Sequence, residues 1–203
     1  MASGMSQRPL VLASNNEGKL RELNALLEPL AFTAIAQRQL DIEDAEETGS
    51  TFIENAILKA RHAAAVSQTM ALADDSGIVV PALNGRPGIY SARFSGRGDQ
   101  ANNEKLLAEM SGLSGNDRSA YYIAVIAVML SDSDPTPLIA EGRWYGRIAT
   151  KPAGSSGFGY DPLFIPEGHN KTAAEMSPDE KKALSHRSKA LAALMPQLTA
   201  LKS

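Results

Sequence analysis

The chain has 203 residues, 43% of them hydrophobic and 21% charged, which excludes a disordered or fibrous protein and suits one compact unit, or two lobes that share a core. Its formal net charge of −3 argues against the broad basic surface of a duplex DNA binder. Because it has no cysteine, the chain can form neither disulfides nor thiolate metal sites.

The sequence shows no membrane or secretory segment. No apolar run reaches the roughly 18 residues of a membrane span, and the longest candidate, residues 121–130, is better explained as a buried strand. Residues 1–8 lack the basic and apolar regions of a secretory signal. We therefore expect a flexible tail at residues 1–8 and a cytoplasmic protein.

The first predicted elements are a strand, a turn and a helix. Residues 9–13 are a short apolar strand, and residues 14–19 have the polar and glycine content of a turn. The leucines that follow recur at spacings of three and four, which predicts a helix that buries Leu20, Leu23, Leu27 and Leu30.

A second strand, predicted at residues 32–36, leads into an acidic loop. Thr51 and Glu54, beyond that loop, are spaced as a capping box and predict a helix with an apolar face over residues 52–64. The loop itself has five carboxylates within seven residues, which repel one another unless positive charge lies nearby: Asp41, Glu43, Asp44, Glu46 and Glu47.

Strand and helix patterns alternate through the middle of the chain. An apolar strand at residues 70–73 is predicted to end at Asp74 and Asp75, with extended structure resuming at residues 78–83. A helix is predicted at residues 99–110. Strands are predicted at residues 119–130 and 138–150, the second of them a hairpin bent near Tyr145 and Gly146.

The last third of the chain combines a loop with helix. Residues 151–161 are too rich in glycine and serine for an element interior, so they predict a loop whose backbone can approach a ligand. Ser177 and Glu180 form a capping box that begins the final helix. On one continuous helix, Lys181 and His186 would lie about 140° apart, and a break near Ser185 would remove that separation.

The turn at residues 14–19 is a candidate phosphate site. Backbone N–H groups at a helix N-terminus, with a lysine in the first turn, suit phosphate oxygens. The turn is not a Walker A loop, because that pattern needs glycine and Ser or Thr where this chain has Ala13 and Leu20. The alternative is an ordinary turn with Asn16 as helix cap and Lys19 in solvent.

The acids are candidate ligands for Mg²⁺, which prefers a few hard oxygen ligands and leaves room for water and phosphates. Asp74 and Asp75 are candidates together with Glu46 and Glu47. Because adjacent strand residues point to opposite faces, only one aspartate can face the site unless the strand has already ended there, and the other is structural. The alternatives are a solvated turn for the acids and a solvated helix face for Lys59.

Two further groups suit a nucleoside. Phe158 and Tyr160 can stack on or wall a base, and Asp161 can accept from ribose or base N–H groups; the alternative is a hairpin whose rings fill the core. His186 and Arg187 lie with Lys181 at the last helix, where the alternative is a solvated helix start.

Taken together, these motifs resemble those of the inosine triphosphate pyrophosphatases, which hydrolyse ITP, dITP and XTP to the monophosphate and pyrophosphate. Because several ordered motifs would have to coincide, the alternatives above lose most of their weight. The resemblance covers almost the whole chain and rests on Ser14-x-Asn16-x-x-Lys19, Glu46–Gly49 with Phe52–Ala60, Ala73–Gly77, Pro87–Arg93, Gly157–Pro162 and Ser185–Arg187.

The resemblance implies an α/β fold, in which an extended mixed β-sheet and flanking helices form two lobes around a central cleft, and a homodimer. It implies that Asp75 is the proton acceptor and, with Glu47, a Mg²⁺ ligand, while Lys59 lies near the phosphates and Ser76 touches the substrate. The triphosphate would be held by Ser14, Asn15, Asn16, Glu17, Gly18 and Lys19. The nucleoside, recognised by its 6-keto oxygen, would be bound by Phe158, Gly159, Tyr160, Asp161, Lys181, His186 and Arg187.

The turn departs slightly from the family pattern, with Ser-Asn-Asn where many relatives have Thr-Gly-Asn. Glu17 stands close to the phosphates, where it either weakens affinity or points outward. Two rival functions stay open: a related pyrophosphatase for modified pyrimidine or methylated nucleotides, and a noncatalytic nucleotide sensor or nucleic-acid-binding module. The expected partner is a purine nucleoside triphosphate, with no nucleic acid and no membrane.

Overall fold

The structure is a computed structural model that describes residues 8–201. The flexible tail predicted for residues 1–8 lies outside the described residues except for Arg8, which begins the first strand. None of the helices in the described range has the length and apolar character that a membrane span needs.

Within residues 8–201, six strands form one open, mixed sheet in the order β2-β1-β3-β4-β5-β6. Strand β1 pairs in parallel with β2 and β3, whereas β5 pairs antiparallel with β6. The predicted mixed α/β sheet is therefore confirmed. The strand bounds are β1 (Arg8–Leu12), β2 (Phe32–Ala36), β3 (Ala71–Val79), β4 (Ser119–Met129), β5 (Leu138–Ile148) and β6 (Phe164–Pro166).

The helices begin where local capping chemistry places them. The Thr51 hydroxyl accepts the Glu54 N–H at the start of the second helix, and Ser177 caps the fourth helix with Glu180 in the same way. The predicted capping positions are confirmed. The helices are α1 (Glu17–Leu27), α2 (Phe52–Ser67), α3 (Asp99–Glu109), α4 (Pro178–Leu184) and α5 (His186–Ala200).

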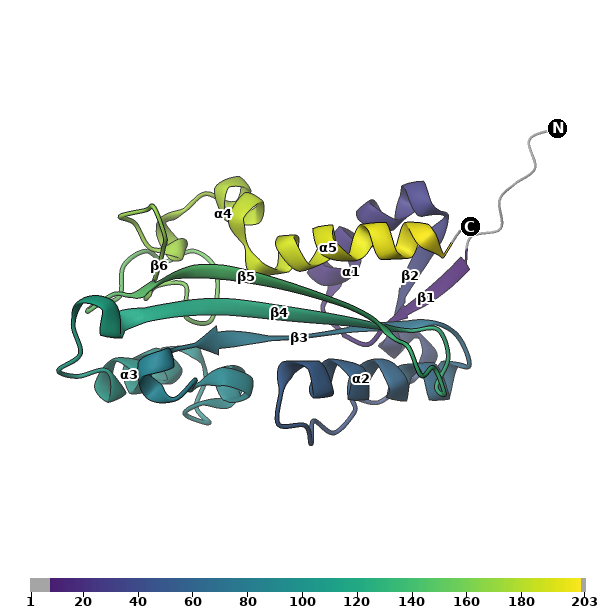
Figure 1. Cartoon of the computed structure of the whole chain (residues 1–203), viewed down its shortest axis with the longest axis horizontal. Coiled ribbons are helices and arrows are strands. Elements are labelled where there is room, and N and C mark those ends of the chain that lie inside the picture. The colour runs from purple at the N-terminus through teal and green to yellow at the C-terminus, as the bar shows by residue number, and fades with distance from the viewer. Residues whose placement is uncertain (1–7, 202–203) are drawn as a thin grey trace. The chain divides into compact units, whose positions relative to one another are not determined.

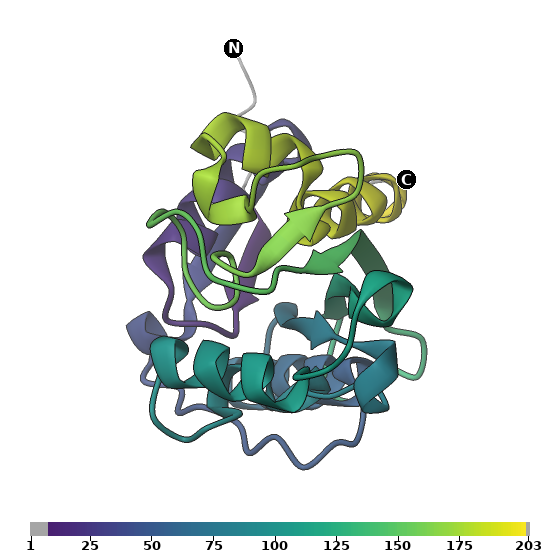
Figure 2. The ribbon, with the colours of Figure 1, turned by 90° about the vertical axis from the view of Figure 1, so that its left-hand side faces the viewer.

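The described chain divides into two compact units. Unit 1 comprises residues 8–75, 125–140 and 191–201, and unit 2 comprises residues 76–124 and 141–190. In unit 1, α2 covers one side of the strands, and α1 and the later part of α5 cover the other (Figure 1). In unit 2, α3 and α4 lie on opposite sides of β5, as both Figure 1 and Figure 2 show.

Each unit has a core suited to its elements. In unit 1, α2 presents alanines that are fully buried, Ala56, Ala60 and Ala63, and this small-residue face packs near β1. In unit 2, aromatic rings fill the core. The ring of Phe164 meets those of Tyr122 and Trp144 edge-on, with centroids 4.8 and 5.1 Å away. Such edge-to-face pairs add to the burial of apolar surface.

Strand β3 is longer than its sequence predicts. It does not end at Asp74 but continues without interruption to Val79, so both aspartates lie inside a strand. The extended structure expected after Val79 is wrong for residues 81–83, which form a 3-10 turn that begins with Pro81.

The hairpin predicted near Tyr145 and Gly146 is wrong. Strand β5 continues to Ile148, and Gly146 pairs with Pro166 of β6, a short strand that the sequence did not predict. A side chain at position 146 would collide with the Phe164 ring. Glycine therefore serves the close approach of a neighbouring strand rather than a turn.

Candidate functional site

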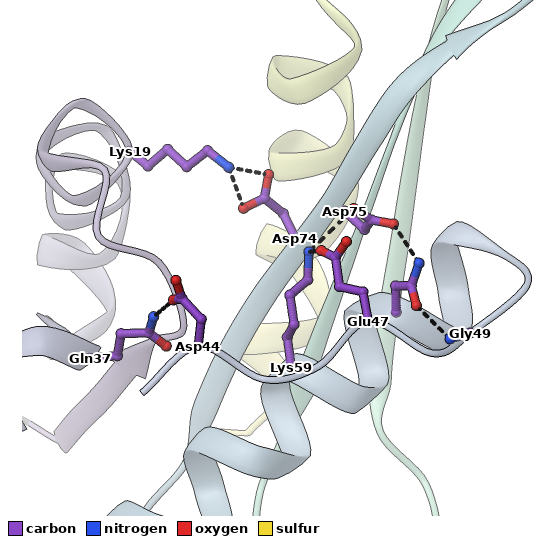
Figure 3. A network of polar contacts seen from close by, with 9 residues as sticks. Lys19, Gln37, Asp44, Glu47, Gly49, Lys59, Asp74 and Asp75 are labelled. Carbon is purple, nitrogen blue, oxygen red and sulfur yellow. Dashed lines mark hydrogen bonds and ion pairs between the residues drawn. The ribbon is translucent and has the colours of Figure 1, made fainter. Parts of the chain in front are cut away.

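Two lysines and three carboxylates form a network in unit 1 (Figure 3), which we call the acid–lysine cluster: Lys19, Glu47, Lys59, Asp74 and Asp75. Helix α1 supplies one lysine and α2 the other, β3 supplies both aspartates, and the acidic loop supplies the glutamate. The fold thus gathers four separate stretches of sequence, among them the first strand-to-helix corner.

The two aspartates of the cluster have different partners because they point to opposite faces of β3. Both Asp74 oxygens accept from Lys19 Nζ at 2.9 Å, and this carboxylate is 5% exposed. Asp75 Oδ1 accepts from Lys59 Nζ at 3.2 Å, and its Oδ2 accepts from Asn55 Nδ2 at 3.4 Å. Asp74 therefore anchors Lys19, whereas Asp75 faces α2 and the acidic loop.

Lys59 joins the two separate acids, with its Nζ 2.8 Å from Glu47 Oε1. Burial raises the pKa of Asp75, and the nearby Glu47 carboxylate raises it further, against the opposing effect of Lys59. Burial alone would lower the pKa of Lys59, but Asp75 and Glu47 outweigh it and the pKa is raised. Asp75 is thus a better proton acceptor than an ordinary aspartate, beside a lysine that stays charged.

Two carboxylates of the cluster, Glu47 and Asp75, have the chemistry of ligands for a divalent cation. No three His, Asp or Glu side chains gather as a metal site in the part of the chain that the structure describes. Mg²⁺ in phosphate sites commonly uses one or two carboxylates and completes its shell with water and phosphates. Glu47 and Asp75 supply two such carboxylates, whereas Glu46 is exposed.

The turn at residues 14–19 agrees with its alternative interpretation at Asn16 but not at Lys19. Asn16 is the helix cap, since its Oδ1 accepts the Lys19 N–H at 3.1 Å. Lys19 is not simply solvated, because it is paired with Asp74 and is 24% exposed. Glu17 points to Arg38, and this hydrogen bond lowers the pKa of Glu17. The negative charge of Glu17 is therefore paired with the guanidinium of Arg38.

The other residues predicted to contact the phosphate end of the substrate are mostly exposed. Ser14 Oγ accepts the Asn16 N–H at 3.2 Å, and Asn15 lies 3.5 Å from Asp44 through its amide nitrogen. Asn15 and Gly18 are exposed at the start of α1. Ser76 is exposed in β3, next to the cluster in sequence but assigned to unit 2.

The two aromatic rings of the glycine loop, residues 151–161, differ in their exposure to solvent. Tyr160 is 3% exposed, and its hydroxyl donates to the Ser91 carbonyl at 2.8 Å, so this ring fills the core. Phe158 is 74% exposed, with Lys181 Nζ 4.8 Å from its ring centre. Asp161 is buried and accepts from both the Phe158 N–H and Lys181. Phe158 is therefore the ring that remains available to a base.

Helix α3 holds the glycine loop at one residue, Gly159, a feature that sequence patterns did not reveal. The Gly159 N–H donates to Asp99 Oδ2 at 2.7 Å, and the Gly159 carbonyl accepts from Asn103 Nδ2 at 2.8 Å. Both side chains are polar residues on a half-exposed helix, where polarity alone gives no sign of a tertiary role. The contact fixes the residue that follows Phe158.

The break predicted near Ser185 is confirmed. Helix α4 ends at Leu184, and Ser185 has extended backbone and caps α5 through the Ser188 N–H at 3.2 Å. The His186 ring then stacks on Tyr122, with centroids 4.8 Å apart and planes 9° from parallel. Arg187 is half-buried beside it in sequence. The stacking partner Tyr122 was missed because it lies in a strand that looks uniformly apolar.

Comparison with known proteins gives a consistent result. The model of the Ham1 family matches residues 10–197. A dITP/XTP pyrophosphatase of Xanthomonas oryzae is 53% identical over 95% of this chain and 98% of its own. One from Legionella pneumophila is 52% identical over 91% of this chain and 95% of its own. A Ham1 protein structure from Coxiella burnetii superposes with a TM-score of 0.91 at 48% identity, covering 95% of this chain and 99% of that one.

Proposed function

The chain belongs to the Ham1 family, and on that premise we propose that it hydrolyses dITP, XTP and ITP to the nucleoside monophosphate and pyrophosphate. Relatives about half identical over nearly their full length carry the name dITP/XTP pyrophosphatase. The observation that carries the proposal to this chain is the pairing of Glu47 and Asp75 across Lys59. This pairing provides a positive charge on Lys59 and a proton acceptor in Asp75.

The residues of the acid–lysine cluster have complementary roles in the proposed reaction. Lys19 and Lys59 offset phosphate charge, and Asp75 takes the proton of a water that attacks the α phosphorus. The bond from that phosphorus to the bridging oxygen breaks, and pyrophosphate leaves. Glu47 and Asp75 would hold a Mg²⁺ ion, which supplies Lewis-acid neutralisation of the phosphates.

The nucleoside is assigned to the residues of unit 2. Phe158 offers its exposed face to the base, while His186 and Arg187 supply polar contacts at the start of α5. Donors aimed at a 6-keto oxygen would face the amino group of adenine, and such a mismatch can discriminate by about 10⁴–10⁵. A homodimer and a cytoplasmic location belong to the same proposal.

Pyrophosphate release tests this function directly. We expect release from ITP, dITP and XTP in the presence of Mg²⁺, much less from ATP, and none above background in EDTA. Asp75→Asn should lower kcat by about 10²–10⁴, with unchanged circular dichroism. Asp41→Asn is the matched control, because Asp41 is an exposed aspartate of the acidic loop that is not part of the acid–lysine cluster.

Three results would contradict the proposal. Wild-type kcat in Asp75→Asn would remove the assigned proton acceptor. Faster release from methylated or modified pyrimidine nucleotides would favour the related pyrophosphatases. Tight binding of ITP without any release would favour a noncatalytic sensor.

A further inference from the structure

Unit 2 contains a pocket that none of the predicted substrate residues lines. Its volume is about 500 Å³, within the usual range for sites of small molecules. It lies where the end of β5 meets β6 and the 3-10 turn at Gly115–Arg118. Ile148 and Ile165 give it apolar walls, and Asn170 adds a polar group.

The pocket has an excess of positive charge. Arg118, Arg147 and Lys151 line it, and none of the three forms an ion pair with a carboxylate of the described residues. Glu175 is the single acid in the lining, and its Oε2 already accepts the Thr172 N–H at 2.7 Å. The lining therefore has three cationic side chains and one carboxylate, and that carboxylate already accepts a hydrogen bond.

Arg118 is the unusual member of this group because it is 8% exposed. Its guanidinium donates to four backbone carbonyls, with the shortest bonds, 2.7 Å, to Ile148 and Ala149 and the others to Met110 and Leu113. A guanidinium has five N–H donors, so one is left over. Carbonyl dipoles satisfy hydrogen bonds, but a buried charge without a counter-ion remains costly. An anion in the pocket would offset that cost.

We propose that this pocket binds a small phosphate-bearing molecule. A phosphate dianion matches the cation excess, and guanidinium groups recognise phosphate oxygens with paired hydrogen bonds. The isoleucine walls can take the apolar part of an ester. Arg147 and Lys151 are exposed and would meet the anion at the mouth, with Arg118 below them in the wall.

Titration by NMR separates this site from the substrate site. Inorganic pyrophosphate and adenosine monophosphate are added, in separate experiments with EDTA, to ¹⁵N-labelled protein. We expect saturable shifts of the Ala149, Lys151 and Asn170 amides. The double variant Arg147→Ala/Lys151→Ala should weaken the Kd at least about tenfold, as loss of two charge-assisted contacts implies. Arg97→Ala, an exposed cation of unit 2 outside the pocket, should keep the wild-type Kd.

The two probes identify the source of the phosphate. Tighter binding of adenosine monophosphate supports a phosphate ester that uses the apolar walls, and tighter binding of pyrophosphate supports an inorganic anion. The proposal is overturned if shifts are confined to residues 14–19 and 158–161, or if the double variant binds both probes as the wild type does.

Discussion

At the scale of single residues, two adjacent glutamates of the acidic loop have different surroundings. Glu47 is 26% exposed and bound to Lys59, whereas Glu46 is exposed. If Glu47 shares an ion with Asp75, Glu47→Gln should raise the Mg²⁺ concentration for half-maximal activity about tenfold or more, roughly 1.4 kcal/mol. Initial rates of pyrophosphate release across a Mg²⁺ series measure this.

The neighbouring glutamate provides the control. Glu46→Gln removes the same charge from the same loop, so general electrostatic effects of the loop should appear equally in both variants. Equal Mg²⁺ requirements for Glu46→Gln and Glu47→Gln would show that neither residue is a specific ligand.

At the scale of elements, α3 determines how the glycine loop is presented. Asn103→Ala removes the bond to the Gly159 carbonyl, and one such hydrogen bond contributes about 1 kcal/mol. We expect KM for ITP to rise about fivefold while kcat changes less, because the loop is the proposed nucleoside site and has no proposed part in bond breaking. Steady-state kinetics separate the two constants.

Gln100→Ala is the matched control for this variant, since Gln100 is an exposed amide on the same helix whose side chain donates to Glu104, also on that helix. A fall in kcat with KM unchanged in Asn103→Ala would contradict a positioning role for the helix. Thermal denaturation of both variants identifies any general loss of stability.

Helix α4 should respond to acid through its capping box. Hydrogen bonds from Lys171 and from the Ser177 N–H lower the pKa of Glu180 from 4.5 to about 2. A lowered pKa in the folded state stabilises the fold above the unfolded-state value of about 4.5, and this contribution is lost as pH falls from there toward 2. Wild type should therefore exceed Glu180→Gln in Tm at pH 6.

That difference should shrink between pH 4.5 and pH 2. Asp179→Asn, which changes the neighbouring acid that lacks the Lys171 partner, should show a smaller change over the same range. A Tm difference between wild type and Glu180→Gln that is constant from pH 6 to pH 2 would rule out the ion pair as its source.

The elements that sequence predicts well are those that depend on neighbours in the chain. The caps at Thr51 and Ser177 and the break at Ser185 rest on contacts three residues apart. The end of β3 and the path of β5 depend on partner strands instead. Gly146 indicates a turn locally, yet its role is set by β6, a partner that local patterns do not reveal.

The same distinction applies to the candidate site. Strand alternation predicts that the side chains of Asp74 and Asp75 point to opposite faces of the strand, and in the structure they bind different lysines. The choice of Lys19 as the partner of Asp74 joins residues 55 positions apart and follows only from the packing of α1 against the sheet. The Gly159 contacts with α3 likewise span more than 50 positions, so no local pattern could indicate them.

At the scale of the whole molecule, the predicted substrate residues fall into two groups. Ser14–Lys19, Glu47, Lys59 and Asp75 belong to unit 1, whereas Ser76 and Phe158–Asp161 with Lys181, His186 and Arg187 belong to unit 2. The proposed function requires one nucleotide to contact both groups, because the phosphates and the base are parts of one molecule. This requirement is independent of the chemistry assigned to Asp75.

Hydrogen exchange with a bound substrate tests the requirement. In Asp75→Asn, which should bind dITP without rapid turnover, saturating dITP with Mg²⁺ should slow exchange in peptides that cover residues 14–19 and in those that cover residues 154–161. Binding to a native state lowers the population of locally open forms wherever the ligand makes contact. Deoxyinosine alone should protect only the second group and pyrophosphate only the first, because each carries half of the contacts. Protection by dITP limited to one group would mean that the two units do not share a substrate.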